Sequence, residues 1–435
     1  MNRLKILFFI FLTCQGFKTF SQTDTLQLTL SQAESLLLEN NLSLLAEQLN
    51  LEKAEAEKIQ AKVWPNPTLT IEEFNPYVTA YQKRHAEEQA SLFGSENFGK
   101  YRQVEIQLEQ VFNLAGGRKK QQAIAEVSAE QAEVFLEDFL LDMKTQFRKK
   151  IYDFTYHQLF SQLLNQQLSS VTTILRAYEN QFEKSNINKM ELIRLRASEM
   201  KLKDEIIDEK STLSELQAAL IVLLNLPDNT HIVFDEVFRE DYDYQNFEAE
   251  LSFLQDQALE KRPDIKIFEL QKQLAEREYN YEKSLRTPDL GVSINYDRGG
   301  GIYPDYVGVG VSMDLPFSNP NKGNIKKAQI KIEQQDYLNQ EHLIKVKTDI
   351  RKKHERVQYF SAFFEEIDAE YVDDLDKTMN AYTEYFRNRN INITTYMDFL
   401  EAYIDSKEAI FDNQREFLNA LEDLKYATGL DSLSF

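Results

Sequence analysis

The sequence has a single cysteine, Cys14, which lies in a short apolar segment at the start of the chain. Two cationic residues precede an apolar run over residues 6–12 that leads to Ser21, and this is the layout of a secretory signal peptide. We therefore expect a signal peptide over residues 1–21. The mature chain then holds no cysteine, which excludes a disulfide framework and a thiolate metal site.

Long apolar runs are absent as well. A membrane-spanning helix needs roughly 18 or more consecutive apolar residues, and no segment of the chain approaches this length. If the chain enters a membrane, it has to do so as a closed barrel, since only helices and closed barrels satisfy all backbone polar groups in lipid. With 13 glycines and 9 prolines in 435 residues, the chain could form two ordinary domains or one elongated repeat structure.

A positive net charge is also lacking. The formal net charge is −21, and loss of the expected leader makes it more negative, because that leader carries three cationic residues and no acidic one. This charge argues against nucleic acid as a partner. The five histidines are dispersed without a metal-binding spacing, and no glycine-rich phosphate loop follows a parallel strand. We expect no metal site, no cofactor and no enzymatic activity.

The second half of the chain repeats the first. In one gap-free register, the Leu-Ser pair at 251–252 aligns with that at 30–31. In a second register, the Asn-Ile-Asn at 390–392 aligns with that at 186–188. Each copy has the same predicted order: amphipathic helix, strand, strand, very long helix, second helix. Two copies of one structural unit explain this self-similarity.

Long helices dominate both copies. Between about Arg118 and Phe182, apolar residues recur at spacings of three and four, which is typical of a helix with one buried face. About 65 residues at about 1.5 Å each give roughly 100 Å of helix, and we interpret the apolar stripe as a coiled-coil core. The first predicted repeat covers 22–228, with strands near 66–76 and 101–112 and a helical hairpin over 118–226. A connector over 229–250 follows. The second predicted repeat covers 251–435, with strands near 288–297 and 305–316 and a helical hairpin over 323–429.

Four segments alternate between apolar and polar or small residues, as strands do. The clearest are 290–297 and 307–315; 104–109 follows the same pattern, with a shorter partner at 69–71. Strands of about ten residues with this alternation suit a bilayer-spanning barrel, with the apolar face toward lipid and the polar face toward a lumen. The alternative is a half-buried hairpin of a soluble protein. Since four strands cannot close around a lumen, the barrel interpretation requires several chains to share one sheet.

Short motifs carry a resemblance to a known family. Leu-Ser-Gln-Ala at 30–33 leads to Glu-Asn-Asn at 39–41, and Pro-Asn-Pro at 65–67 opens a strand. With the duplicated order of helices and strands, these motifs resemble the TolC-like outer-membrane efflux family over nearly all of the mature chain. The segment 111–118, Val-Phe-Asn-Leu-Ala-Gly-Gly-Arg, resembles the strand-to-helix junction of the branch that includes the metal exporters CzcC and CusC.

The resemblance implies a mainly α-helical protein with a transmembrane β-barrel. It would be a homotrimer in the outer membrane, with a twelve-stranded barrel carried on a long periplasmic α-helical tunnel, and residues 229–250 would belong to the equatorial region of that tunnel. In the family, such a duct receives cargo from an inner-membrane pump, here of the RND type, through a periplasmic adaptor protein. The resemblance therefore implies export of small toxic compounds or metal ions.

Other functions remain open. A duct of the same fold for type I protein secretion would have the same sequence pattern and would differ only in its partners. A periplasmic coiled-coil adaptor or scaffold would explain the helices but would leave the alternating strands without a purpose. A surface hydrolase is the least consistent function, since the sequence has no nucleophile constellation.

The turns between the paired helices are the first candidate site. They are the most closely repeated short segment, and the far end of a helix of roughly 100 Å is well placed to meet a partner. Family members usually have a glycine here, where this chain has Ser185 and Arg389. We predict that the turns contact the adaptor; the alternative is that Asn and Ile simply make a good turn, with Asn tolerating left-handed geometry. The predicted contact residues are Ser185, Asn186, Ile187, Arg389, Asn390 and Ile391.

The second candidate site is an acidic pair, Asp398 and Glu401, in a segment that resembles the family's acidic periplasmic entrance. The two residues are three apart and so share one helix face, and threefold symmetry would repeat them around a narrow mouth. Such a ring would concentrate cations and raise the proton affinity of its carboxylates. The first copy has Arg194 and Ala197 at the matching positions, and the alternative is a solvated helix face.

Overall fold

The structure is a computed structural model of the chain. The expected signal peptide over 1–21 lies outside the described residues, as do Ser185 and Asn186 of the first predicted contact turn. Among the residues described, no helix has both the length and the apolar character that a membrane span requires. The described residues are 25–72, 80–85, 104–184, 187–235, 237–238, 244, 247, 249–298, 305–315, 317, 320–367 and 369–431.

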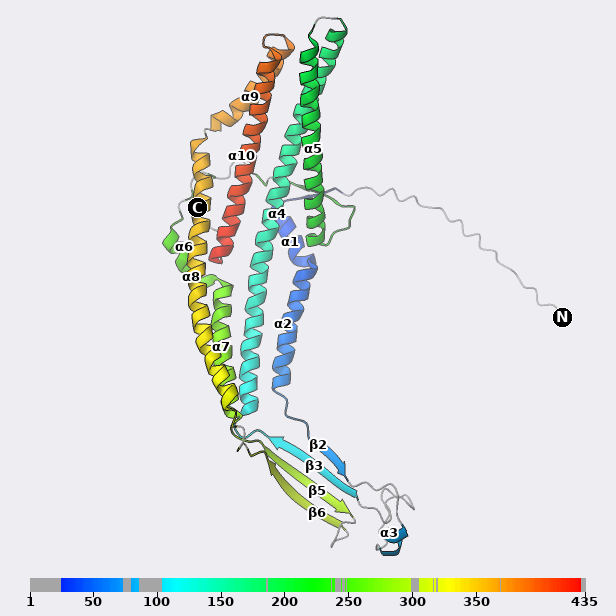
Figure 1. Cartoon of the computed structure of the whole chain (residues 1–435), viewed down its shortest axis with the longest axis vertical. Helices are drawn as coiled ribbons and strands as arrows, with labels where there is room; N and C mark the ends of the chain where they lie inside the picture. Colours follow the sequence, from blue (N-terminus) through cyan, green and yellow to red (C-terminus); the bar gives the residue numbers. More distant parts are fainter. Residues whose placement is uncertain are drawn as a thin grey trace, which may run out of the picture. The chain divides into compact units, whose positions relative to one another are not determined.

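Helices make up most of the described chain (Figure 1). The elements of the first half are β1 (Thr25–Leu28), α1 (Leu30–Asn40), α2 (Leu42–Ala61), β2 (Thr68–Glu72), α3 (Ala80–His85), β3 (Val104–Phe112), α4 (Gly117–Glu183) and α5 (Lys189–Leu224). Those of the second half are β4 (His231–Phe234), α6 (Leu251–Lys261), α7 (Pro263–Ser284), β5 (Leu290–Arg298), β6 (Asp305–Met313), α8 (Lys322–Glu366), α9 (Ala369–Arg387) and α10 (Ile393–Thr428).

The two halves agree in where their helices begin and end. In the register that aligns Leu251 with Leu30, α6 begins and ends at the positions that match the ends of α1. In the register that aligns Asn392 with Asn188, α10 matches α5 at both ends, and the end of α9 matches the end of α4. The repeat in the sequence is therefore also a repeat in the secondary structure.

After its short first strand, each half has two helices where the apolar pattern predicts one. The breaks fall at Asn41 and Arg262, whose backbones are extended, with φ −65° and ψ 117° at the first and φ −71° and ψ 123° at the second. Pro263 explains the second break, because proline has no N–H and fits only the first turn of a helix. In the first half, the Asn41 side chain donates to the Leu223 carbonyl 2.8 Å away, a contact that competes with a continuous helix.

The long helix of the second half is also divided, which corrects the prediction of one continuous helix. α8 ends at Glu366 and α9 begins at Ala369. Phe364 before the break and Leu375 after it are both buried. The spacing of apolar residues reports which face of a helix is buried, so it does not reveal a break that leaves this face unchanged.

The chain folds into two compact units, to which α4, α8 and α10 each contribute residues. We call them the hairpin unit, which comprises Met1–Leu42, Lys144–Asn246 and Tyr359–Glu422, and the sheet unit, which comprises Ser43–Met143, Phe247–Gln358 and Asp423–Phe435.

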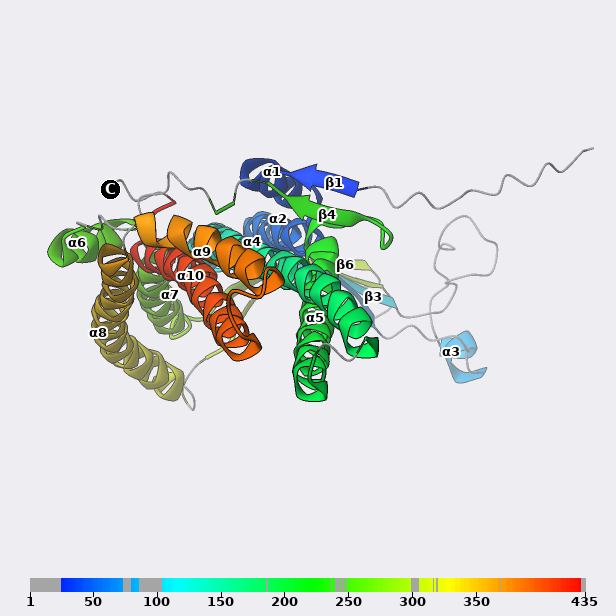
Figure 2. The ribbon, with the colours of Figure 1, turned by 90° about the horizontal axis from the view of Figure 1, so that it is seen from above.

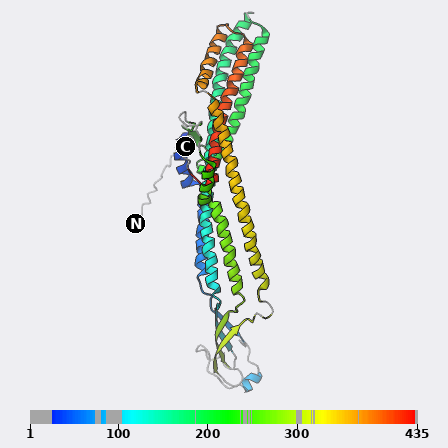
Figure 3. The same ribbon diagram turned by 90° about the vertical axis from the view of Figure 1, so that its left-hand side faces the viewer.

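In the hairpin unit, α4 and α5 form one helical hairpin and α9 and α10 form the other, and the four helices lie side by side (Figure 3). Their core is a cluster of buried apolar residues drawn from all four helices, among them Leu164, Leu195, Met379 and Tyr396. The parallel strands β1 and β4 also belong to this unit (Figure 2). β4 lies within the predicted connector, and its four residues are too few for their alternation to be recognised.

The sheet unit holds a four-stranded sheet in the order β2-β3-β5-β6, with all neighbours antiparallel. β3 and β5 pair from Val104 opposite Arg298 to Phe112 opposite Leu290, so strands from the two halves of the chain meet at the centre of the sheet. Beyond the sheet, α4 packs against α7 through a small apolar cluster. This cluster consists of Val127, Val134, Ile267 and Leu270, with Leu274 beside it.

Candidate functional site

The turn between α9 and α10 is built by local hydrogen bonds. The Asn390 N–H donates to the Tyr385 carbonyl at 2.8 Å, and the Arg389 N–H donates to that of Phe386 at 3.0 Å. The Asn392 side chain accepts from the Thr395 N–H at 2.9 Å and so caps the start of α10. These bonds fix the shape of the second predicted contact turn.

The same capping residue recurs in the first turn. Asn188, which matches Asn392 in the repeat, is the N-cap of α5 and accepts from the Met190 N–H at 3.1 Å. Ile187, the residue before this cap, also lies within the described residues. Helix capping therefore explains why the last Asn of the Asn-Ile-Asn motif occurs in both turns.

Arg389 has a left-handed backbone, with φ 62°. In the turn between α9 and α10, the left-handed position therefore belongs to Arg389 and not to an Asn, as the alternative interpretation of the turn had it. L-residues other than glycine lose roughly 1–2 kcal/mol in this conformation, so a glycine would be favoured at this position. Arginine at this point costs stability and presents a cation at the end of the hairpin.

Aromatic stacking joins the two hairpins near their turns. The Phe386 ring lies between Tyr178 and Tyr396, with ring centroids 5.2 Å and 4.6 Å away and interplanar angles of 19° and 6°. Phe386 and Tyr396 are fully buried. These rings come from α4, α9 and α10, so one stacked aromatic cluster joins the helices of both hairpins near their turns.

Asp398 and Glu401 both line a groove of about 660 Å³ between α5 and α10. Apolar residues such as Phe160 and Leu202 form its floor, and Arg194 and Lys201 are its cations. Within the described ranges, no three His, Cys, Asp or Glu side chains are arranged to hold a metal ion. The carboxylates that line the groove are Glu205, Asp208, Glu209, Asp398, Glu401, Asp405 and Glu408.

Glu401 has a cationic partner that its own segment does not suggest. Lys201 Nζ on α5 lies 3.1 Å from Glu401 Oε1, and 3.8 Å from Glu205 on its own helix. The hydrogen bond to Glu401 raises the pKa of Lys201. The side chains of Lys201 and Glu401 are 59% and 64% exposed, so solvent screens this pair.

Two further carboxyls of the groove hold protons more tightly than usual. Burial raises the pKa of Glu205, and the nearby Asp405 raises it further against the effect of Lys201. Burial is also the main cause that raises the pKa of Glu408, and Asp405, Glu205 and other acidic neighbours raise it further. Like charges packed between two helices disfavour each other's ionised forms.

The sequence alone predicts two of these carboxylates, Asp398 and Glu401, and not the other five. For two of the five, Asp405 and Glu408, the available signal was the spacing on α10, where acidic residues recur at 398, 401, 405, 408 and 412. Steps of three and four place them on one helix face. Four of these five residues line the groove between α5 and α10, and Asp412 does not.

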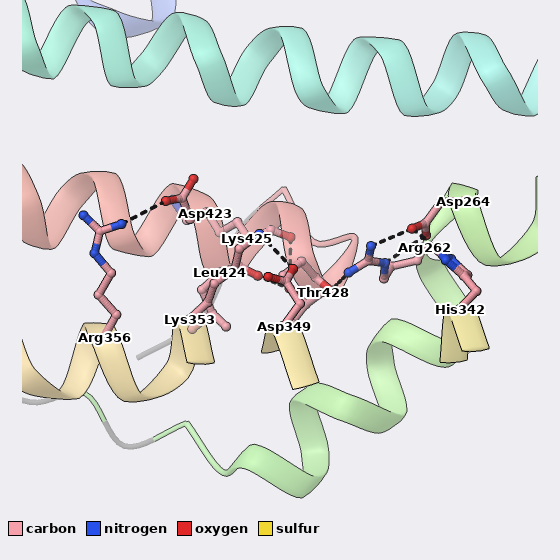
Figure 4. A network of polar contacts seen from close by, with 11 residues as sticks. Arg262, Asp264, His342, Asp349, Lys353, Arg356, Asp423, Leu424, Lys425 and Thr428 are labelled. Carbon is pink, nitrogen blue, oxygen red and sulfur yellow. Dashed lines mark hydrogen bonds and ion pairs between the residues drawn. The ribbon is translucent and has the colours of Figure 1, made fainter. Parts of the chain in front are cut away.

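A polar network in the sheet unit is structural (Figure 4). Arg262 donates to Asp264 through two nitrogens at 2.9 and 2.6 Å, and to the Ala427 carbonyl of α10 at 2.7 Å. His342 Nε2 lies 3.1 Å from Asp264, and its ring stacks on Phe268. Burial acts to raise the pKa of Asp264, but Arg262 outweighs it and holds that pKa below its usual value. The network fastens the last turn of α10 to the break between α6 and α7.

Solved structures with the same architecture are known, although no protein-family model and no curated protein sequence matches the chain. The channel-forming protein CusC is similar with a TM-score of 0.70 at 15% identity over 94% of both chains. The outer-membrane channel CmeC of Campylobacter jejuni has a TM-score of 0.70 at 14% identity, over 92% of this chain and 85% of its own. The outer-membrane protein VceC of Vibrio cholerae has a TM-score of 0.67 at 13% identity, over 92% and 96%. The chain therefore has the fold of the TolC-like outer-membrane channels, as its motifs predict.

Proposed function

We propose that three copies of this chain form the outer-membrane exit duct of a tripartite efflux system. Each copy contributes four strands to a closed twelve-stranded barrel and four helical segments to a periplasmic tunnel. The duct takes cargo from an inner-membrane pump of the RND type through a periplasmic adaptor protein. The cargo is a small toxic compound or a metal ion.

The observation that carries this proposal is a sheet with two open edges. Within the described residues, β2 pairs only with β3, and β6 pairs only with β5. Open edges present unpaired backbone N–H and C=O groups to other chains, and only closure removes them. Pairing of β6 in one copy with β2 in the next would satisfy both edges and close the barrel.

The two faces of the sheet support lipid outside and water inside. On β6, the side chains of Val307, Val309 and Val311 are 69%, 76% and 72% exposed, which matches the outward pattern of a transmembrane barrel. On the opposite face, Glu109 accepts hydrogen bonds from Ser312 and Gln107. A polar face of this kind suits a water-filled lumen.

The hairpin unit supports the partner side of the proposal. Its turns form the adaptor contact, with Ile187, Arg389, Asn390 and Ile391 among the described residues and Ser185 and Asn186 outside them. Asp398 and Glu401 belong to the acidic entrance. The chemistry that supports this role is the groove of seven carboxylates and two cations, which favours cations at the mouth.

Membrane fractionation of cells that express the full chain tests location and assembly. We expect the protein in the outer-membrane fraction, and a detergent-extracted species of three times the mass of the mature chain, which is the 51.0 kDa chain without residues 1–21. A soluble monomer would contradict the proposal.

Cells that lack the protein test the cargo. We expect greater sensitivity to toxic compounds or metal ions, restored by the wild-type gene. Unchanged sensitivity together with loss of a protein from the medium would instead identify a duct for type I secretion.

A further inference from the structure

Lysine and arginine residues gather where the sheet of the sheet unit meets its helices. In α4, three cations stand at the first turn, and neither that turn nor the first turn of α8 contains an acidic residue. No Asp or Glu occurs in 110–125 or 315–332, although the whole chain has a net charge of −21. We call the following residues the basic collar: Lys62, Arg118, Lys119, Lys322, Lys326 and Lys327.

The collar cations are available to an outside partner. Lys119, Lys322, Lys326 and Lys327 make no salt bridge with a carboxylate in the part of the chain that the structure describes, and all four are exposed. Lys331, one turn further along α8, instead pairs with Glu278 at 2.5 Å. The lysines nearest the sheet therefore carry unneutralised charge.

Their position on the helices is unfavourable without an anion. The N-terminus of a helix carries partial positive charge, so cations in the first turn are repelled by it. Lys119 and Lys322 both occupy such turns, at the starts of α4 and α8. An anion bound outside would offset this repulsion at both helices.

Exposed apolar and aromatic side chains separate the collar from the strands. Leu315 and Phe317 follow β6 and are 61% and 86% exposed, and Trp64 precedes β2 and is 53% exposed. The Arg118 guanidinium lies 3.9 Å from the Trp64 ring centroid and donates to the Lys62 carbonyl at 3.1 Å. Apolar strands, then aromatic rings, then cations is the order of groups from the hydrocarbon of a bilayer to its headgroups.

We propose that the basic collar binds the anionic headgroups of phospholipids on the periplasmic face of the outer membrane, with Trp64 at the level of the headgroups. This inference rests on the proposed function, which places the sheet in that membrane. Charge complementarity identifies the occupant, because lysines near a membrane surface attract anionic lipids. The collar would fix the depth at which the barrel sits.

Trp64 is the only tryptophan of the chain, so its fluorescence reports on the collar alone. The full-length protein is reconstituted in phosphatidylcholine vesicles that contain a minor fraction of phosphatidylglycerol. Bromine is placed near the headgroup end of the acyl chains of one lipid or the other. We expect bromine on phosphatidylglycerol to quench more strongly, corresponding to roughly fivefold local enrichment, and high salt to remove the difference.

Two variants of α8 with equal charge loss complete the test. Lys322→Gln/Lys326→Gln/Lys327→Gln should abolish the preference for phosphatidylglycerol. Lys347→Gln/Arg351→Gln/Lys352→Gln, further along the same helix, should retain it. Equal quenching by both lipids in the wild type, or equal loss in both variants, would overturn the collar while leaving the membrane position intact. No quenching by either lipid would overturn the proposed membrane position itself.

Discussion

Lys201 on α5 and Glu401 on α10 form an ion pair with 3.1 Å between Nζ and Oε1. The two residues of the predicted acidic entrance are therefore not equivalent. Glu401 is partly neutralised across the groove, whereas Asp398, three residues earlier, has no such partner among the described residues. The field at the proposed entrance should depend on the lysine as much as on the carboxylates.

Substitutions at this pair should change ion selectivity in opposite directions. Asp398→Asn should lower the ratio of cation to anion permeability, on the order of twofold, and weaken block by divalent ions. Lys201→Gln should raise that ratio, because it releases the charge of Glu401. Planar-bilayer reversal potentials measure both effects. If neither variant differs from the wild type, these side chains are surface charge and the constriction lies elsewhere.

The groove should respond to pH through Glu205 and Glu408. Their pKa values are raised above the ordinary value of 4.5, so the folded protein binds more protons than the unfolded chain between 4.5 and the raised values. Stability contributed by these groups therefore falls as the pH rises through this window. We expect the thermal midpoint of the hairpin unit to increase on mild acidification.

Glu205→Gln/Glu408→Gln provides the matched variant for the pH response. It should have a higher midpoint than the wild type at neutral pH and a flatter dependence on pH, because neutral amides remove the repulsion with Asp405. Circular dichroism melts at several pH values measure this. A pH dependence identical to that of the wild type would show that other groups control it.

Two substitutions at Arg389 separate the effect of its left-handed backbone from the effect of its charge. Arg389→Gly suits the left-handed backbone and should leave the thermal midpoint nearly unchanged, since the gain of about 1 kcal/mol is offset by the entropy of glycine in the unfolded chain. Arg389→Glu combined with Asn186→Trp should abolish export while trimers remain in the membrane. Full export by the double variant would refute the contact with the adaptor.

The network around Arg262 should be important for stability. Arg262→Met leaves the Ala427 carbonyl without its donor and Asp264 with only His342 beside it. Removal of one member of a fully buried pair costs about 3–5 kcal/mol, and because Asp264 is 21% exposed we expect a loss of stability below this range. Arg262→Lys should restore part of this, because lysine keeps the charge but cannot bind bidentately. Lys272→Met, which breaks the exposed pair with Asp336, is the control and should have a much smaller effect. Equal shifts in melting temperature for Arg262→Met and Lys272→Met would contradict this account.

The elements that the sequence predicts well are those with a sustained period. α4 spans Gly117–Glu183, close to the predicted 118–182, because its apolar stripe continues over many turns. β5 and β6 lie where the alternation runs over many consecutive positions. When a pattern repeats over many periods, few other secondary structures are consistent with the sequence.

The breaks could not be read from periodicity. Pro263 indicates the break in the second half. Because the repeat aligns Arg262 with Asn41, a break at Asn41 in the first half can be inferred from it. The division between α8 and α9 has no such residue. β1 and β4 are short, and they pair although most of the first half of the chain separates them, so neither strand has a local signal.

The site was predictable on one helix only. Asp398 and Glu401 follow from the acidic spacing on α10, but Lys201 and Glu205 belong to α5, in the other half of the chain. The matching position of Lys201 in the second copy is Asp405, so the repeat itself does not indicate the ion pair. Contacts between distant helices depend on which faces pack together, and the pattern of either helix alone does not specify its partner.

Single-channel recording tests the central claim most directly. The protein, purified from the outer-membrane fraction and added to a planar lipid bilayer, should produce discrete, cation-selective conductance steps. The number of steps, and not their size, should increase with trimer concentration. Absence of conductance from a homogeneous trimer that has inserted into the bilayer would contradict the account of this chain as an outer-membrane channel.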